Sequence, residues 1–215
     1  MKFEFPKIYP ITDTVISPLS PLEQLKEMAA GGAALIQLRE KRASAGQFFD
    51  AARQALDHAR ANGVRVIIND RVDIALLLKA NGVHLGQNDL PPVHARRLLG
   101  EDAIIGYSTH SLSQAEEAVK LPIDYLAFGP IFPTSTKDDP DPVVGLELLA
   151  EIRQVAGNLP LIAIGGIDET NLAAVLAAGA DSAAVIRTVL ADRDGIERKV
   201  RSLFALGAGQ NASNV

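Results

Sequence analysis

The chain has 215 residues, of which 47% are hydrophobic and 22% charged, with a formal net charge of -5. This length suits one α/β domain with a sizeable buried core. The acidic balance argues against a nucleic acid or an anionic membrane as partner, because both would require clustered Lys and Arg. The chain has no cysteine, which excludes disulfides, thiolate metal sites and cysteine nucleophiles.

The chain shows no sign of targeting or membrane insertion. Its first residues, MKFEFPKIYPITD, lack the apolar segment of a secretory signal, and no apolar stretch approaches the length of a membrane span. We therefore expect a cytoplasmic location and no membrane partner. The oligomeric state stays open, and a homo-oligomer formed through the outer helices is one option. Residues 207–215, GAGQNASNV, predict a frayed C-terminal tail.

Eight short apolar runs alternate with amphipathic segments along the chain. The runs occupy residues 8–13, 34–40, 65–70, 82–87, 103–109, 124–130, 159–166 and 182–188. Several are apolar throughout their middles, as expected for parallel strands covered on both faces. Between the runs, apolar residues recur at helical spacing, as in Leu146, Leu149 and Ile152.

This alternation predicts a single (β/α)8 TIM barrel over residues 1–215. An open doubly wound sheet is the main alternative. That fold usually has a glycine-rich turn after its first strand, and ITDTVISP contains none.

In such barrels the residues that follow the strands carry function. The second run ends in Gln37, Arg39 and Lys41, and strand alternation points these three side chains the same way. They predict a site for an anion and a ring nitrogen. The alternative is a solvated strand end with local ion pairs.

Two carboxylates follow neighbouring runs, Asp70 beside Asn69 and Asp89 in the sequence QND. At one barrel level they would suit Mg²⁺, which takes one or two carboxylates together with substrate phosphates. The alternative for each is local: Asp70 pairs with Arg71 or caps the next helix, and Asp89 caps the helix that Pro91 and Pro92 begin.

Hydroxyls and glycines lie at or just after the ends of the remaining runs. Ser108, Thr134, Thr136 and Lys137 together predict a diphosphate clamp. Gly166 ends the seventh run, and Ile186 and Arg187 lie at the end of the eighth, where barrels frequently bind a phosphate. We expect His84 to be a hydrogen-bonded interior residue or to support the site from behind, whereas His110 is either a helix-start residue or an acid–base group.

The motifs taken together resemble the thiamine-phosphate synthase family. IYPITD, IQLREK, INDRVDIAL, GVHLGQNDLP, IGYSTH, FGPIFPTSTK, AIGGI and GADSAAVI occur in that family's order and approximate spacing, across nearly the whole chain. INDR followed by GVHLGQNDLP, and GPIFPTSTK, are the specific motifs. AIGGI alone would be weak, because many phosphate-binding barrels carry it.

The resemblance implies a transferase with a Mg²⁺-dependent reaction. Its two substrates are 4-amino-2-methyl-5-hydroxymethylpyrimidine diphosphate and the phosphate ester of 4-methyl-5-(2-hydroxyethyl)thiazole, which it joins. It places Gln37, Arg39, Lys41 and Asn69 at the pyrimidine diphosphate, Asp70 and Asp89 at the metal, and Ser108 and Lys137 at the diphosphate. Thr134, Thr136, Gly166 and Ile186 would lie near the thiazole phosphate. Lys137, Ser108 and Arg39 are the expected catalytic residues, and Arg187 stands where the family often has Ser.

Three other functions compete with this one. A thiazole tautomerase on the same barrel would use His110 to carry a proton, but would not need Asp70, Asp89 and Lys137 together. A catalytically silent regulator would be expected to lack one of these residues. An unrelated phosphate-binding barrel enzyme is the third.

Overall fold

The computed structural model describes residues 4–136 and 141–209. Its strands are β1 (Ile8–Pro10), β2 (Leu35–Leu38), β3 (Arg65–Asn69), β4 (Gly82–Leu85), β5 (Ile104–Thr109), β6 (Tyr125–Phe128), β7 (Leu161–Ile164) and β8 (Ser182–Val185). Its helices are α1 (Pro21–Ala30), α2 (Ala45–Ala61), α3 (Val72–Leu77), α4 (Pro92–Leu99), α5 (Leu112–Ala118), α6 (Gly145–Ala156), α7 (Leu172–Ala177), α8 (Arg187–Leu190) and α9 (Ile196–Gly209).

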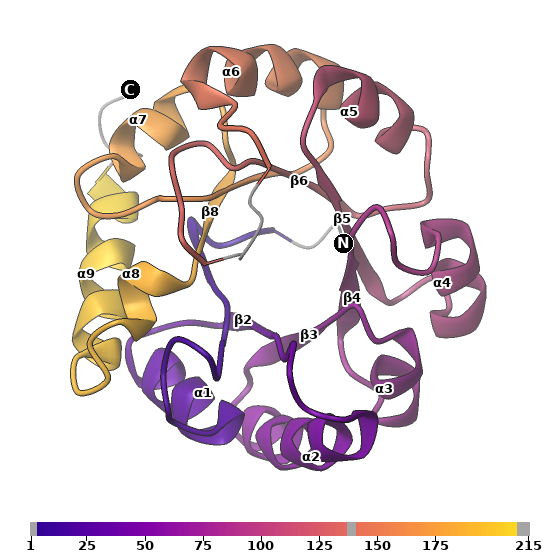
Figure 1. The fold of residues 1–215 in the computed structure, drawn as a ribbon, viewed down its shortest axis with the longest axis vertical. Coiled ribbons are helices and arrows are strands. Elements are labelled where there is room, and N and C mark those ends of the chain that lie inside the picture. The colour runs from indigo at the N-terminus through magenta and orange to yellow at the C-terminus, as the bar shows by residue number, and fades with distance from the viewer. Residues whose placement is uncertain (1–3, 137–140, 210–215) are drawn as a thin grey trace.

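The strands form one parallel sheet in the order β1-β8-β7-β6-β5-β4-β3-β2. The sheet curls into a ring with the helices outside it (Figure 1). The ring closes where Ile11 pairs with Gln37, and the Thr12 amide donates to the Gln37 carbonyl at 2.9 Å. Each of the eight apolar runs contains one strand, so the predicted (β/α)8 barrel is confirmed.

Strand alternation separates two apolar layers. One cluster fills the inside of the ring and contains Tyr9, Ile11, Leu35, Ile67, Ile104, Tyr125, Ala127, Ile162 and Ala184. The residues between them along the strands, such as Ile36 and Leu126, belong to a larger cluster that packs against the helices. The strands are therefore buried on both faces, which is why their sequences are so apolar.

Hydrogen-bonded caps fix the start of the first two helices. Ser20 begins α1 and Ser44 begins α2, and each exchanges hydrogen bonds with the third helical residue, Glu23 or Gln47. These reciprocal capping boxes satisfy amides that the helix itself leaves free. They fix where the chain turns back after β1 and β2.

Two predicted boundaries are wrong at the C-terminal end. The eighth run extends to residue 188, but β8 ends at Val185 and Arg187 begins the short helix α8. Helix α9 continues through Gly209 with Gly207 buried, so the first three residues of the predicted frayed tail are helical. The rest of that tail lies outside the described residues. Within the described ranges, no helix has the length and apolar character needed to cross a membrane.

The inside of the barrel leaves no room for a side chain at Gly106. A Cβ there would lie 1.9 Å from Cζ of the Tyr125 ring. We predict that Gly106→Ala lowers the free energy of unfolding by about 1–3 kcal/mol, the usual cost of overpacking a core. Urea unfolding measures the change.

Gly46→Ala is the matched control, because Gly46 lies in α2 with nothing within 4 Å of the added carbon. This substitution should leave the protein as stable or stabilise it by up to about 1 kcal/mol. Equal unfolding midpoints for Gly106→Ala and the wild type would contradict the packing described.

Candidate active site

A cavity of about 920 Å³ opens at the C-terminal ends of the strands. Its volume is that of a typical small-molecule site. Every predicted site residue that the structure describes lines it: Gln37, Arg39, Lys41, Asn69, Asp70, Asp89, Ser108, Thr134, Thr136, Gly166, Ile186 and Arg187. Lys137 lies outside the described residues.

A second cavity of about 960 Å³ lies at the other end of the barrel, where strands β3 to β7 begin. Volume therefore does not distinguish the two. In (β/α)8 barrels the C-terminal end carries the chemistry and the N-terminal end contributes to stability. Polar residues converge at the first cavity, so we take that cavity as the candidate active site.

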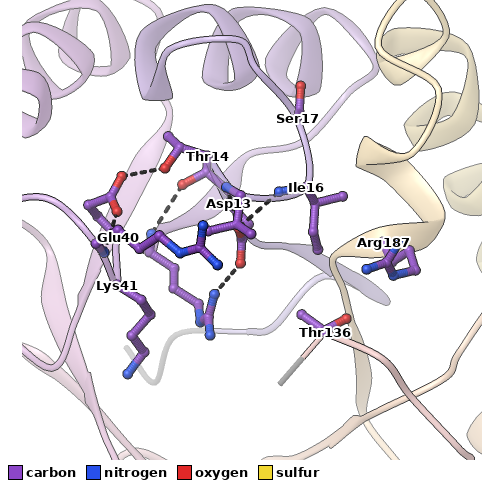
Figure 2. A network of polar contacts seen from close by, with 12 residues as sticks. Asp13, Thr14, Ile16, Ser17, Glu40, Lys41, Thr136 and Arg187 are labelled. Carbon is purple, nitrogen blue, oxygen red and sulfur yellow. Dashed lines mark hydrogen bonds and ion pairs between the residues drawn. The ribbon is translucent and has the colours of Figure 1, made fainter. Parts of the chain in front are cut away.

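Asp13 anchors the site at the barrel seam. It follows β1 and is 2% exposed. Its carboxylate accepts hydrogen bonds from the Val15 and Ile16 amides at 2.8 and 3.2 Å and forms an ion pair with Arg39 (Figure 2). The Arg39 amide also donates to Thr12 Oγ1 at 3.1 Å. Arg39 is thereby held at the cavity wall by an ion pair with a residue 26 positions away, and its side chain is only 13% exposed rather than solvated.

The sequence analysis missed Asp13, although the residue ends the first apolar run, IYPITD. A carboxylate directly after a strand was the available signal. Its partner could not be identified, because Arg39 lies 26 positions away and only barrel closure brings the two residues together.

Glu40 faces away from the cavity, as strand alternation predicts, and joins the loops that follow β1 and β2. Thr14 donates a hydrogen bond to its carboxylate, and the Arg42 and Ala43 amides donate at 2.8 and 3.2 Å (Figure 2). Burial raises the pKa of the Glu40 carboxyl, but these hydrogen bonds outweigh burial and lower it overall. The ionised Glu40 therefore shapes the loop that carries Lys41.

The two predicted metal carboxylates are neighbours. Asp70 follows β3 in a left-handed conformation with φ of 63°, which is uncommon outside glycine but tolerated by Asp. Its carboxylate pairs with Lys41 at 2.5 Å, and its amide donates to the His84 carbonyl at 2.8 Å. The alternative pairing with Arg71 is wrong, because Arg71 pairs with Asp73.

Asp89 turns back on its own loop, where its carboxylate accepts a hydrogen bond from the Gly86 amide at 2.7 Å. It does not cap α4, whose first residue follows Pro91 without a side-chain cap. Burial raises the pKa of the Asp89 carboxyl, and the nearby Asp70 carboxylate raises it further. A cation between the two carboxylates would relieve this repulsion.

Among the described residues, no group of three or more His, Cys, Asp or Glu side chains is arranged for a metal. A carboxylate pair suits Mg²⁺, which keeps several waters and takes phosphate oxygens from a substrate. It does not suit Zn²⁺, whose sites need three or four protein ligands.

Because the folded protein raises the pKa of Asp89, ionising this residue costs stability. The cost is absent at pH below the ordinary Asp pKa and grows as the pH rises through the raised value. We predict that Asp89→Asn, measured by thermal unfolding in EDTA at neutral pH, stabilises the protein by less than about 1 kcal/mol, because Asp89 is partly solvated.

The side-chain amide oxygen that Asp89→Asn introduces can still accept the hydrogen bond from the Gly86 amide, so only the charge is lost. The gain should vanish at acid pH. Asp57→Asn, which removes an exposed charge from α2, should show no such pH-dependent gain. An Asp89→Asn variant less stable than the wild type at neutral pH in EDTA would contradict the repulsion.

Asn69 carries an unpartnered donor at the cavity. The residue is 7% exposed, and its Nδ2 atom is buried without a hydrogen-bond partner. A buried polar atom without a partner costs about 1–3 kcal/mol. The observation is explained if a ligand accepts this hydrogen bond, which agrees with the predicted role of Asn69.

The opposite side of the cavity is formed by glycines and hydroxyls. Gly165 and Gly166 have φ of 102° and 62°, and a Cβ at Gly166 would lie 2.6 Å from the Pro133 carbonyl oxygen. Only glycine fits there, which lets the loop that follows β6 pack directly against this turn. Thr134 donates to Thr136 at 3.2 Å in the neighbouring loop.

Arg187 turns toward this side rather than away from it. Its guanidinium donates to the Ser135 carbonyl at 3.3 Å, and Figure 2 shows it beside Thr136. A cation therefore stands at the exit of β8 where the related family often has a small hydroxyl.

Both histidines of interest line the cavity. His84 contacts the Tyr125 hydroxyl through Nδ1 and Ser108 Oγ through Nε2, each at 2.8 Å, which confirms the expected hydrogen-bonded interior residue. His110 contacts the Gly129 carbonyl through Nδ1 at 2.6 Å. Because a carbonyl only accepts, Nδ1 of His110 carries the proton.

A family model described as Thiamine monophosphate synthase matches residues 8–189. The chain belongs to this family. A thiamine-phosphate synthase of Syntrophomonas wolfei is 43% identical over 92% of this chain and 95% of its own. That of Chloroflexus aurantiacus is 44% identical over 93% and 92%. The solved thiamine phosphate pyrophosphorylase of Pyrococcus furiosus is 35% identical, with a TM-score of 0.84 over 95% and 96% of the two chains.

Membership of this family confirms the resemblance found in the motifs and makes the protein a transferase. A solved 3-hexulose-6-phosphate synthase, 16% identical with a TM-score of 0.69, shares the fold alone. An unrelated phosphate-binding barrel enzyme is thus no longer a competing explanation.

Proposed function

We propose that the protein is a thiamine-phosphate synthase, which condenses 4-amino-2-methyl-5-hydroxymethylpyrimidine diphosphate with 4-methyl-5-(2-phosphooxyethyl)thiazole. One observation carries the proposal beyond family membership. The Asp70–Asp89 carboxylate pair, flanked by Lys41 and Arg39, shares a cavity with the tight Gly165–Gly166 turn. One side thus suits a metal-bound diphosphate and the other a monophosphate.

The pyrimidine diphosphate would occupy the side formed by strands β2 to β5. Gln37 and Asn69 supply amide groups for the pyrimidine ring, and the unpartnered Nδ2 atom of Asn69 supports this placement. Arg39, Lys41 and Ser108 supply donors for the diphosphate. Lys137, outside the described residues, is proposed for the same group from its motif.

Asp70 and Asp89 would hold Mg²⁺. When bound there, the ion would supply charge neutralisation at the diphosphate. Lys41 pairs with Asp70, and the lysine side chain is 46% exposed. The Lys41 ammonium group can therefore move from the Asp70 carboxylate to the diphosphate, because it is already partly exposed to solvent.

The chemistry requires no protein nucleophile. The carbon–oxygen bond to the diphosphate breaks, and the diphosphate leaves with the electron pair. The resulting benzylic-type cation is delocalised by the aminopyrimidine, and the thiazole nitrogen then supplies the pair for the new carbon–nitrogen bond. The protein neutralises the leaving group, aligns the thiazole and excludes water.

The thiazole phosphate would occupy the side formed by strands β6 to β8. The Gly166 and Ile186 backbones, the hydroxyls of Thr134 and Thr136, and the Arg187 guanidinium line that side. Arg187 adds a positive charge where a hydroxyl would offer one hydrogen bond, so we expect it to strengthen phosphate binding. The thiazole ring then points toward the pyrimidine carbon.

Thiazole tautomerase activity is the alternative, with His110 as the proton carrier. Its Nδ1–H is used by the Gly129 carbonyl, so only Nε2 is available to exchange a proton with a substrate. A tautomerase would not require the carboxylate pair. The cytoplasmic location and a homo-oligomer remain predictions.

Turnover tests the proposed function directly. Purified protein mixed with both substrates and Mg²⁺ should form thiamine phosphate and diphosphate, and EDTA should abolish the reaction. Asp70→Ala and Lys137→Ala should lower turnover greatly while the protein stays folded. Interconversion of thiazole tautomers without formation of thiamine phosphate would favour the isomerase and contradict the proposal.

The Asp13–Arg39 pair should matter for catalysis although Asp13 itself does not line the cavity. Asp13→Asn keeps an acceptor for the Val15 and Ile16 amides but leaves Arg39 without its counter-charge. We predict a fall in kcat/KM of about 10- to 100-fold, equivalent to about 1.4–2.8 kcal/mol. Steady-state kinetics measures it.

Asp57→Asn, which removes an exposed aspartate on α2, serves as the control and should keep wild-type kinetics. Wild-type kcat/KM in Asp13→Asn would show that Arg39 needs no anchor.

A further inference from the structure

A chain of hydrogen bonds crosses the inside of the barrel between two cavity residues. Gln37 Nε2 lies 3.1 Å from the Tyr9 hydroxyl, which lies 3.3 Å from the Tyr125 hydroxyl. The Tyr125 hydroxyl lies 2.8 Å from His84 Nδ1, and His84 Nε2 lies 2.8 Å from Ser108 Oγ. Gln37 and Ser108 are thus linked through side chains of β1, β6 and β4.

Both tyrosines keep their protons. Each is almost fully buried, and burial raises the pKa of the Tyr9 and Tyr125 hydroxyls well above the ordinary value. A neutral hydroxyl has one proton to donate. Each tyrosine can therefore donate to at most one of its two neighbours in this series of hydrogen bonds.

This restriction gives the chain a direction. The Gln37 amide nitrogen can only donate, so Tyr9 accepts from it, and the buried Tyr9 proton is satisfied by donating to Tyr125. Tyr125 then donates to Nδ1 of His84. Nδ1 carries no proton in that case, and a neutral imidazole has its proton on Nε2, where it points at Ser108 Oγ.

Ser108 is the end of the chain and lines the cavity. Because its oxygen accepts from His84, its own proton is free to point elsewhere. The reverse direction would make Ser108 donate to His84 and would turn only oxygen lone pairs toward the cavity. An anion in the cavity is stabilised by the first arrangement and repelled by the second.

We propose that His84 is a positioning residue that fixes the Ser108 hydroxyl as a hydrogen-bond donor to the diphosphate, and that Tyr125 fixes His84 in the tautomer this requires. The identity of the anion rests on the proposed function. The direction of these hydrogen bonds does not, because it follows from the contacts, the buried tyrosine protons and a neutral His84.

The tautomer is measured first, by long-range ¹H–¹⁵N correlation spectra of protein labelled in its four histidines. His84→Asn assigns the signals. We expect His84 to be protonated on Nε2 and bare on Nδ1. In Tyr125→Phe, which keeps the ring beside Phe5 at 4.8 Å, this preference should weaken. A wild-type His84 protonated on Nδ1 would overturn the proposal.

A double-mutant cycle tests the effect on Ser108. The probe is inorganic diphosphate with Mg²⁺, titrated by calorimetry into wild type, Tyr125→Phe, Ser108→Ala and the double variant. Tyr125→Phe should weaken binding about 10-fold when Ser108 is present and less than about 3-fold when it is absent, because coupled residues are not additive. Equal losses in both backgrounds would mean that Tyr125 acts only through packing.

Thr109→Val is the matched control. It removes a buried hydroxyl from the next position of β5, which donates to the Ala127 carbonyl and does not line the cavity. It should bind diphosphate within about 3-fold of the wild type. If no thiamine phosphate forms but the tautomer and the cycle are as expected, the proposed function fails and the positioning of Ser108 stands.

Discussion

Closure of the parallel sheet is the constraint on which the site depends. Eight strands that run in one direction end at one rim, and the contact between Ile11 and Gln37 brings the first and second strands together. Closure removes both sheet edges. It also places polar residues from distant parts of the chain around one cavity. The Asp13–Arg39 pair lies at this seam, so the last contact that completes the barrel also shapes the anion site.

The site retains several unfavourable features. Asp70 adopts a left-handed backbone, burial and the nearby Asp70 carboxylate raise the pKa of Asp89, and Asn69 Nδ2 is buried without a partner. Such costs persist where the surrounding structure enforces them, and they concentrate at functional sites. The last two would be relieved by the ligands we propose: a cation between the carboxylates and an acceptor at Asn69.

The sequence was sufficient to predict the barrel and most of its rim, for a physical reason. Strands buried on both faces must be apolar, so their ends stand out as the first polar residues, as at Gln37, Asn69 and Ser108. Features that depend on contacts across the ring were not accessible. Three such features require the closed ring: the pairing of Asp13, the direction of the hydrogen bonds through Tyr9 and Tyr125, and the contact of Arg187 with Ser135. The end of β8 was misplaced because Ile186 continues the apolar run, and α8, at four residues, is too short to show helical periodicity.

In the function we propose, one cavity binds the diphosphate on one side and the monophosphate on the other. A crystal structure with thiamine phosphate, diphosphate and Mg²⁺ bound would test it most directly. We predict diphosphate and metal between Ser108 and the Asp70–Asp89 pair, and the phosphate of thiamine phosphate against Gly166 and Arg187. Phosphate groups bound in the reverse order, or a metal bound away from both carboxylates, would contradict the account.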